Sequence, residues 1–261
     1  MTSEIQSSLP AFSAHNIKLP DGRETLPGQG LIEQSGVSQA ALRTLKSLFR
    51  PEEIPGTSVV DLGCLEGGYT LAFARAGFRA TGLEVRDQNI ECCRFVEQEV
   101  KLDNLTFVQD DARNVGEYGP FDATFCCGLL YHLDSPTAYL KTLAACTRRA
   151  LILQTHFAQD TLPKPHEGRL SEMSWHEGNP GRWYREFDES ASREEVAGAL
   201  WASWGNNASF WIEKKHLLRS LVDAGFDCVY EQYDFLSDIV SDTYWEEQGR
   251  SMFIAVKLDR G

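Results

Sequence analysis

Residues 61–70 read DLGCLEGGYT and combine acidic, sulfur-containing and small side chains where an apolar strand pattern gives way to a helical one. Gly63 and Gly67 allow a sharp turn, and their missing side chains open a space beside the carboxyl end of the strand. Asp61, Gly63, Cys64 and Gly67 are the candidate cofactor contacts of this loop. The spacing Gly63-x-x-x-Gly67 differs from the Gly-x-Gly-x-x-Gly of dinucleotide loops. The loop therefore indicates a small cofactor without identifying it.

Two further acidic positions follow, each directly after an apolar run. Glu84 lies about twenty residues past the loop, where a carboxylate can accept hydrogen bonds from both hydroxyls of a ribose. Asp111 and Ala112 follow the next run, and could contact the amino group and ring of an adenine. A solvated acid at Glu84 and a simple turn at Asp111 are the plainer interpretations. Three such features after three successive strands favour a nucleoside-containing cofactor.

The alternation of short apolar runs with helical patterns predicts an α/β fold on a mostly parallel sheet. Asp87 and Ser135 are expected to cap two of the intervening helices. The last two strands, separated by residues 238–242, are expected to pair antiparallel. The expected strands are 58–62, 79–83, 105–109, 121–127, 149–155, 226–235 and 251–257, and the expected helices are 68–76, 88–101, 136–147 and 213–224.

The same patterns divide the chain into four parts. Residues 1–57 form an N-terminal extension with a short hairpin and a helix capped by Ser38. Residues 58–155 form the cofactor-binding core, and residues 213–261 its C-terminal part. Between them, residues 156–212 break the alternation with Pro163, Pro165, a helix opened by a capping box at 192–195, and five of the six tryptophans. This insertion is expected to act as a lid or acceptor-specificity segment.

Taken together, the motifs resemble those of class I S-adenosylmethionine-dependent methyltransferases. The corresponding segments are DLGCLEGGYT, TGLE, QDDARN and FDATFCCGLLYHL, within residues 58–155. The resemblance implies a Rossmann-like, doubly wound, seven-stranded sheet, mostly parallel with an antiparallel last strand, and S-adenosylmethionine as cofactor. It also assigns Asp61 and Gly63 to the methionine tail, Glu84 to the ribose, Asp111 and Ala112 to the adenine, and Cys127 and Gly128 to the sulfonium side.

Three departures from the family pattern narrow the activity. Leu65 stands where the loop usually has a third glycine, so it should narrow the approach to the cofactor on one side. The fourth strand ends in Cys126-Cys127-Gly128 and lacks the Asn-Pro-Pro-Tyr of many amino-methylating enzymes. It also lacks the acid that binds magnesium in catechol-type enzymes.

Two histidines near the ends of the fourth and fifth strands are candidate general bases. His132 follows the fourth strand, and its ordinary pKa lies near neutral pH. His156 ends the fifth strand on the same edge of the sheet. For each, a structural histidine bonded to a backbone carbonyl is the alternative. No carboxylate or cysteine completes a zinc-type spacing with the histidines, so no metal is expected.

Aromatic residues supply the candidate substrate contacts. Tyr131 adjoins His132, while Trp183, Tyr184 and Trp204 lie in the insertion and could form the walls of an acceptor site. They could equally anchor the insertion to the core or form the face of a homodimer. Arg182, Arg185 and Arg193 could bind an anionic acceptor, although surface ion pairs are their more common role.

Composition restricts partners and location. The formal net charge of −13 disfavours nucleic acid, because neutralising phosphates needs a basic surface. No apolar run is long enough to span a bilayer, and the N-terminus does not resemble a signal peptide, so a cytoplasmic protein is expected. The seven cysteines lack metal or redox spacing and are expected to be reduced.

These observations favour an enzyme that moves a methyl group to an oxygen or nitrogen of a small molecule, such as a secondary metabolite or a sugar. The stretch YHLDSP also resembles wobble-uridine tRNA alkyl transferases, which gives one alternative. A non-catalytic S-adenosylmethionine-binding protein is another. A nicotinamide-dependent oxidoreductase is disfavoured, because Leu65 and Glu66 oppose a pyrophosphate at the helix start.

Overall fold

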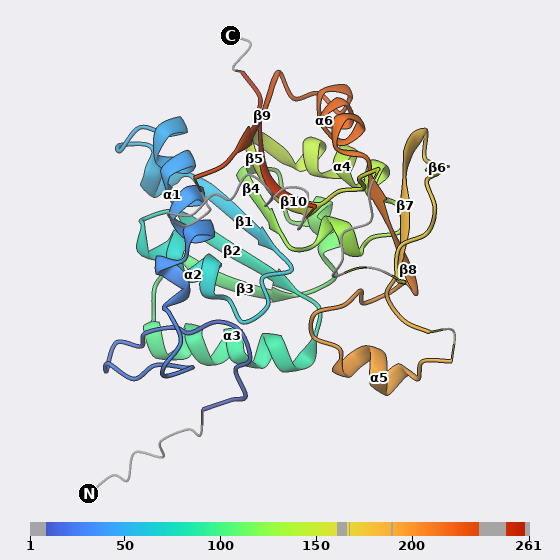
Figure 1. Cartoon of the computed structure of the whole chain (residues 1–261). Helices are drawn as coiled ribbons and strands as arrows, with labels where there is room; N and C mark the ends of the chain where they lie inside the picture. The colour runs from blue at the N-terminus through green and yellow to red at the C-terminus, as the bar shows by residue number, and fades with distance from the viewer. Residues whose placement is uncertain (1–8, 161–165, 167, 189, 235–248, 259–261) are drawn as a thin grey trace, which may run out of the picture.

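A seven-stranded sheet forms the centre of the computed structural model, which describes residues 9–160, 166, 168–188, 190–234 and 249–258 (Figure 1). Its strand order is β3-β2-β1-β4-β5-β10-β9. β1 to β5 are parallel, and β10 is antiparallel to both its neighbours, as predicted. The strands are β1 (Ser58–Leu62), β2 (Arg79–Glu84), β3 (Leu105–Gln109), β4 (Phe121–Cys127), β5 (Thr147–His156), β9 (Cys228–Gln232) and β10 (Arg250–Val256).

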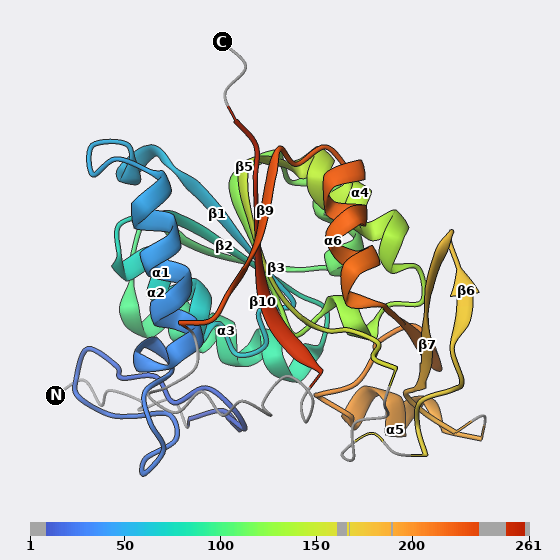
Figure 2. The same cartoon turned by 45° about the horizontal axis from the view of Figure 1, so that its top comes forward.

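Helices cover both faces of this sheet, with α1 to α3 on one side and α4 and α6 on the other (Figure 2). Each layer has its own apolar core, one including Leu45 and Phe73 and the other Leu140 and Leu217. Burial of these two faces is the main stabilising contribution. The helices are α1 (Gly36–Leu48), α2 (Gly68–Arg75), α3 (Asp87–Val100), α4 (Pro136–Cys146) and α6 (Lys214–Asp223), with short 3₁₀ turns at Ile32–Gln34, Ile54–Gly56, Ala112–Glu117 and Leu130–His132.

The strands and helices of the core agree with the expected ranges to within two residues, except that β9 ends at Gln232, three residues before the expected end. This accuracy reflects strong periodicity, since both faces of the sheet are buried. The order of the strands reverses between β1 and β4, so the carboxyl ends of the parallel strands diverge there. A crevice at that point is the usual ligand site of an open α/β sheet. The stretch 238–242 lies outside the described residues.

Two of the predicted helix caps were wrong, and a third, Ser135, occupies the predicted N-cap position without a side-chain bond. Ser35, not Ser38, caps α1 and accepts a hydrogen bond from the Ser38 N–H. Arg86 precedes α3, and Asp87 is its first helical residue. The Ser135 side chain makes no capping bond to α4. There the Glu177 carboxylate accepts hydrogen bonds from the N–H groups of residues 137 and 138, a long-range contact that no local pattern encodes.

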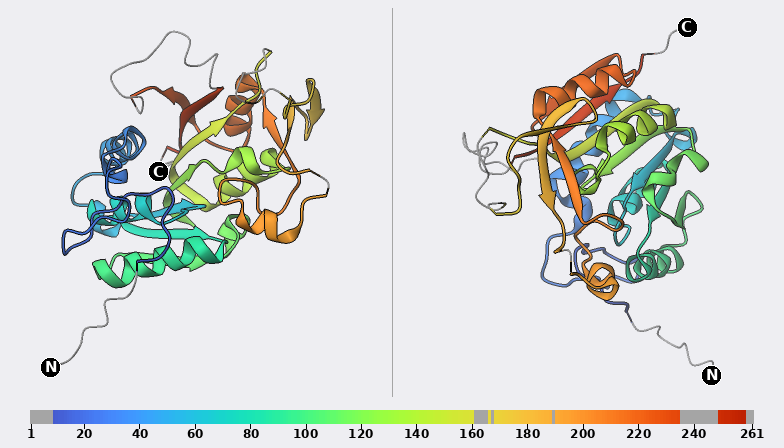
Figure 3. Two further views of the ribbon diagram at one scale, coloured as in Figure 1. Left: turned by 60° about the horizontal axis from the view of Figure 1, so that its bottom comes forward. Right: turned by 90° about the vertical axis from the view of Figure 1, so that its right-hand side faces the viewer.

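The insertion contains a second, three-stranded antiparallel sheet that was not predicted. It consists of β6 (Ser174–His176), β7 (Asn179–Arg185) and β8 (Ala208–Ile212). A short helix, α5 (Arg193–Gly198), lies between β7 and β8, and its predicted capping box of Ser192 and Glu195 is present. Both views of Figure 3 show these orange segments beside one end of the main sheet rather than continuing it.

The N-terminal extension is tied to the glycine loop. The predicted hairpin is present as an isolated antiparallel bridge between Lys18 and Glu24. Beyond it, the buried Glu66 carboxylate accepts hydrogen bonds from the N–H groups of residues 13–15, and His15 Nδ1 accepts one from Gly68 N at 3.0 Å. Burial lowers the pKa of His15 to about 4, so its imidazole is neutral and can accept this bond. Division of the chain at residues 57, 155 and 212 stays a prediction.

Among the described residues, no helix has the length and apolar character needed to cross a membrane. All seven cysteines are free thiols, and six of them are buried or half-buried. Cys64 and Cys93 lie closest to each other, with sulfur atoms 3.9 Å apart. Burial raises the pKa of the Cys64 thiol, which therefore behaves as a small apolar group in the core.

Candidate active site

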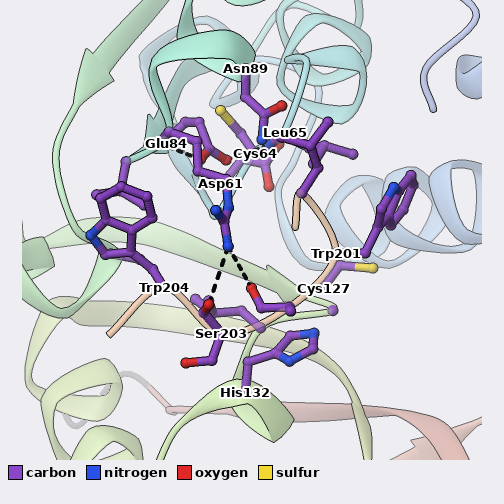
Figure 4. Close-up of a pocket in the computed structure, with 18 of the residues that line it drawn as sticks. Asp61, Cys64, Leu65, Glu84, Asn89, Cys127, His132, Trp201, Ser203 and Trp204 are labelled. Carbon is purple, nitrogen blue, oxygen red and sulfur yellow. Dashed lines mark hydrogen bonds between the residues drawn. The ribbon is translucent and has the colours of Figure 1, made fainter. Parts of the chain in front are cut away.

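A cavity of about 460 Å³ opens at the carboxyl ends of β1, β2 and β4 (Figure 4). Residues 200–206, here called the strap, connect α5 to β8 and form part of its wall. The cavity is large enough for a nucleoside-sized ligand. It brings together eleven residues singled out in the sequence: Asp61, Gly63, Cys64, Glu84, Asp111, Ala112, Cys127, Gly128, Tyr131, His132 and Trp204.

Asp61 is the penultimate residue of β1, lines the cavity and is almost completely buried. Thr70 Oγ1 donates a hydrogen bond to its Oδ2 at 2.7 Å. Burial raises the pKa of Asp61 to about 7, and the nearby Glu84 carboxylate adds to the rise. A cationic ligand in the cavity would favour the charged form of this carboxylate.

Glu84 ends β2 and is also buried. Its two oxygens accept hydrogen bonds from the N–H of Leu65 at 3.0 Å and the N–H of Arg86 at 2.8 Å. Burial raises the pKa of Glu84, whereas these N–H groups lower it. Two buried acids in one cavity make it suited to a ligand with positive charge and hydroxyl donors.

The two glycines of the loop, Gly63 and Gly67, have different roles in the structure, and only Gly63 lines the cavity. Leu65 adopts a left-handed conformation with φ 54°, which points its N–H at Glu84. Gly67 is also left-handed, but it does not line the cavity. A Cβ there would lie 2.6 Å from the Phe107 ring and 3.2 Å from Cys93 Sγ. Gly67 therefore allows close packing beneath the loop.

At the end of the cavity beside β3, Asp111 caps the 3₁₀ turn and pairs with Arg113. Its backbone neighbour Ala112 lines the cavity, whereas Asp110 bonds outside it to Tyr118 and Asn114. Asn89, which sequence analysis missed, lines the same region. Its buried amide makes no hydrogen bond of ordinary geometry among the described residues, although it lies near enough to Glu84 to lower the pKa of that carboxyl, so a ligand could supply a partner.

His132 lies on the opposite side of the cavity, in the 3₁₀ turn after β4 (Figure 4). Its Nδ1 is 2.8 Å from Oε1 of Glu186, a buried residue that directly follows β7. Glu186 also accepts hydrogen bonds from Ser209 Oγ at 2.7 Å and from Ser203 N at 3.3 Å. The carboxylate favours the tautomer with hydrogen on Nδ1, which leaves Nε2 as a proton acceptor. Sequence analysis missed Glu186, because no local spacing relates it to His132.

Three of the remaining sequence candidates lie outside the cavity wall. His156 stacks on Trp211 at 4.7 Å, and Tyr184 stacks on the same indole at 4.9 Å. Trp183 packs on Phe210 at 5.2 Å. These rings join the second sheet to β5, which fits the anchoring interpretation of the insertion. His156 nevertheless adjoins the site, since its ring lies 4.7 Å from that of Tyr131.

Tyr131 lines the cavity together with Arg250 from the start of β10. The Arg250 guanidinium lies 5.5 Å from the Tyr131 ring centre and donates to Gln154 Oε1 at 2.9 Å. Cys127 Sγ donates to the same oxygen at 2.9 Å. Arg250 and Gln154 were missed, because they lie far from any motif in the sequence.

The arginines considered for an anionic acceptor have other contacts. Arg182 is buried and donates to the carbonyl oxygens of Gln159, Asp160 and Ser171. Arg185 is exposed and lies 3.7 Å from Asp188. The side chain of Arg193 is outside the described part of the chain. In that described part, no group of three or more His, Cys, Asp or Glu side chains is placed to hold a metal ion.

Comparison with known proteins identifies similar sequences. Residues 59–150 match the family described as methyltransferase domain. A ubiquinone biosynthesis O-methyltransferase of Xanthomonas campestris pv. campestris (strain B100) is 26% identical over 173 residues, which cover 59% of this chain and 71% of that protein.

Solved structures share the fold over most of the chain. The N-terminal domain of EvdMO1, crystallised in the presence of SAH and D-fucose, has a TM-score of 0.65 and 23% identity, covering 93% of this chain and 90% of that one. The 1,6-didemethyltoxoflavin-N1-methyltransferase of Burkholderia thailandensis, with bound 1,6-didemethyltoxoflavin and S-adenosylhomocysteine, has a TM-score of 0.52 and 16% identity, covering 87% and 80%.

Proposed function

We propose that this chain, a class I S-adenosylmethionine-dependent methyltransferase, transfers the methyl group to a hydroxyl oxygen of a small-molecule acceptor. The observation that carries the proposal is the contact between His132 Nδ1 and Glu186 Oε1 at 2.8 Å, on the wall of the cavity. A hydroxyl nucleophile must lose a proton during transfer, and an oriented neutral imidazole is a suitable base.

The residues of the cavity fit this cofactor. Asp61 is assigned to the ammonium of the methionine tail, and Glu84 to the two ribose hydroxyls. Ala112 and Asp111 are assigned to the adenine end. Burial raises the pKa of both carboxylates, and a cationic ligand rich in polar groups would lower both pKa values again and offer partners to the Asn89 amide.

The bound cofactor supplies a methyl group on a sulfonium, which is already an excellent leaving group. The protein then has to align the acceptor, exclude water and remove a proton. His132 Nε2 accepts the acceptor's hydroxyl proton, while Glu186 holds the Nδ1–H tautomer and stabilises the imidazolium that forms. Cys127 and Gly128 line the passage between His132 and Asp61.

The similar proteins support a small-molecule acceptor. One is named for O-methylation in ubiquinone biosynthesis, one was crystallised with D-fucose, and one methylates a nitrogen of a toxoflavin precursor according to its name. The histidine–glutamate pair favours oxygen over nitrogen here, because a neutral amine can attack without a base. A tRNA wobble uridine is the alternative acceptor, and the net charge of −13 speaks against it.

The acceptor region is bounded by aromatic and polar side chains. Trp201 of the strap lines the cavity although its side chain is 64% exposed, so a ligand could cover it. Tyr131, Arg250 and Gln154 add a ring, a cation and an amide on the other side. These groups suit a ring-shaped acceptor that has several hydroxyl groups, such as a sugar or a phenol.

A direct test incubates the purified protein with S-adenosylmethionine and a panel of hydroxylated sugars, phenols and amines, and measures S-adenosylhomocysteine formation and the mass of the product. Turnover with a hydroxyl acceptor that falls about a hundredfold in His132→Ala supports the proposal. Full activity of His132→Ala, or methylation of amines alone, would contradict it.

A further inference from the structure

Arg86 connects the expected ribose site to the strap. It directly precedes α3 and lies two residues after Glu84 in the chain, and its side chain is buried. The guanidinium donates to the carbonyl oxygens of Val196 at 2.8 Å, Ala202 at 2.9 Å and Ser203 at 3.2 Å. It also lies 5.1 Å from the ring centre of Trp204. A single side chain thus contacts both ends of a segment from the insertion.

The strap in turn contacts the catalytic pair. Ser203 N donates to Glu186 Oε2 at 3.3 Å, and Ser203 Oγ donates to Asn206 Oδ1 at 2.7 Å. Asn206 Nδ2 donates to the carbonyl oxygen of His132 at 3.1 Å. The side chain and the backbone of His132 are therefore both restrained through residues of the strap.

On the cofactor side, the backbone N–H of Arg86 donates to Glu84 Oε1 at 2.8 Å. A continuous series of hydrogen bonds therefore runs from Glu84 through Arg86 and Ser203 to Glu186. Figure 4 shows the labelled members Glu84, Ser203 and His132 around one cavity. Arg86 makes its contacts with a planar group that has several fixed donors, and no other residue type can bond these carbonyls in the same way.

Among the described residues, the strap has few other contacts with the core, chiefly the hydrogen bond from Asn206 to His132. Its two indoles, Trp201 and Trp204, are 64% and 41% exposed, so neither is buried in an apolar core. The guanidinium of Arg113 lies close to Gly205, which adds a packing contact near Asp111. Most of the polar attachment of the strap to the core therefore passes through Arg86.

We propose that Arg86 is a positioning residue, which docks the strap against the ribose site and thereby orients Glu186 and His132 for proton transfer. The inference rests on the proposed function for its catalytic consequence. Contact of the cofactor with Glu84 restrains the backbone of Arg86, so cofactor binding and docking of the strap strengthen each other. Cofactor binding should then hold the acceptor site more firmly in the arrangement that the structure shows.

Docking is measured without turnover. The strap contains Trp201 and Trp204, which chymotrypsin can cleave, and S-adenosylhomocysteine is the probe ligand. In the wild type, the ligand should slow strap cleavage. In Arg86→Ala, cleavage should be faster by roughly tenfold or more, because charged hydrogen bonds contribute about 1.5–3 kcal/mol. The cleavage rate of Arg86→Lys should lie between those of the wild type and Arg86→Ala, since the lysine ammonium can replace only some of the guanidinium hydrogen bonds.

Arg94→Ala is the matched control, because Arg94 is an exposed arginine of the same helix and bonds only Gln109 among the described residues. Its cleavage and turnover should equal those of the wild type. In Arg86→Ala, kcat should fall at least about tenfold with a changed pH profile. Affinity for S-adenosylhomocysteine should fall as well, because docking of the strap and cofactor binding strengthen each other.

Unchanged strap cleavage in Arg86→Ala and Arg86→Lys overturns the docking role. Faster cleavage with wild-type kcat and pH profile overturns the positioning role. If Arg86→Ala unfolds by circular dichroism, Arg86→Lys provides the same comparison in a folded protein. Failure of the proposed function gives a different result. In that case S-adenosylhomocysteine still slows strap cleavage in the wild type, but His132→Ala keeps full turnover.

Discussion

His132 Nδ1 and Glu186 Oε1 are 2.8 Å apart although the residues are separated by 54 positions in the chain. The histidine comes from the turn after β4, and the glutamate from the residue after β7 of the second sheet. The insertion therefore supplies part of the proposed catalytic machinery in addition to covering the cavity.

Replacing Glu186 with glutamine tests this pair. The glutamine amide can donate to Nδ1, which would place the hydrogen on Nε2 and remove the proton acceptor from the cavity. We expect Glu186→Gln to lower kcat about a hundredfold. S-adenosylhomocysteine affinity, measured by calorimetry, should stay unchanged. Glu194→Gln, an exposed acid on α5, is the control, and similar losses in both variants would contradict the role of Glu186.

Glu84→Gln tests the ribose assignment. A neutral amide cannot accept hydrogen bonds from both hydroxyls and from the loop N–H groups as a carboxylate does. Calorimetry should show S-adenosylhomocysteine binding weakened by about tenfold or more. Glu91→Gln changes an exposed acid on α3 and should bind as the wild type does. Equal affinity of Glu84→Gln and wild type would remove Glu84 from the ribose site.

The raised pKa of Asp61, about 7, predicts that cofactor affinity depends on pH. A cation in the cavity favours the charged carboxylate, so binding should weaken as pH falls below 7, by up to about tenfold per pH unit. Calorimetry with S-adenosylhomocysteine at pH 6, 7 and 8 measures this. Asp61→Asn should bind weakly at all three values. A wild-type affinity that is flat over this range would contradict the assignment.

The same group affects the stability of the ligand-free protein with the opposite trend. Between the unfolded pKa of about 3.9 and the folded value of about 7, the native state binds more protons than the unfolded state. The contribution of Asp61 to the free energy of unfolding therefore decreases as pH rises through this window. Melting temperatures of Asp61→Asn should change less with pH than those of the wild type.

Trp201→Ala tests the acceptor wall. Because Trp201 lines the cavity and is largely exposed, its removal should raise the KM for the acceptor by about tenfold and leave cofactor affinity unchanged. Trp175→Ala removes another exposed indole, on β6, and should have no effect on either quantity. An unchanged acceptor KM in Trp201→Ala would place the acceptor elsewhere.

Comparison of Gly67→Ala with Gly28→Ala distinguishes two causes of lost stability, backbone strain and overpacking. Both glycines have positive φ, at 78° and 93°, but only Gly67 has side chains within 3 Å of a new Cβ. Strain alone should lower the free energy of unfolding of Gly28→Ala by about 1–2 kcal/mol. Gly67→Ala should lose about 1–3 kcal/mol more through overpacking against Phe107. Chemical denaturation measures both, and equal losses would contradict the packing role.

Local patterns in the sequence were sufficient for the core. The strands that carry Asp61 and Glu84 near their carboxyl ends are mostly buried because helices cover both faces of the sheet, and their short apolar patterns define the edge where the acids gather. Residues near a motif, such as Asp111 and His132, could therefore be placed at the cavity in advance.

The tertiary structure alone decided which side chains complete the site. Glu186 contacts His132, Arg86 contacts the strap, and Arg250 reaches the cavity wall from β10. All three contacts join segments far apart in the chain, and no periodicity records them. The role of the aromatic insertion could not be decided from the sequence for the same reason. Trp183 and Tyr184 have the same sequence pattern whether they line an acceptor site or attach the insertion to the core. Strand periodicity is a local property, whereas the partners of a buried charge depend on which surfaces pack together.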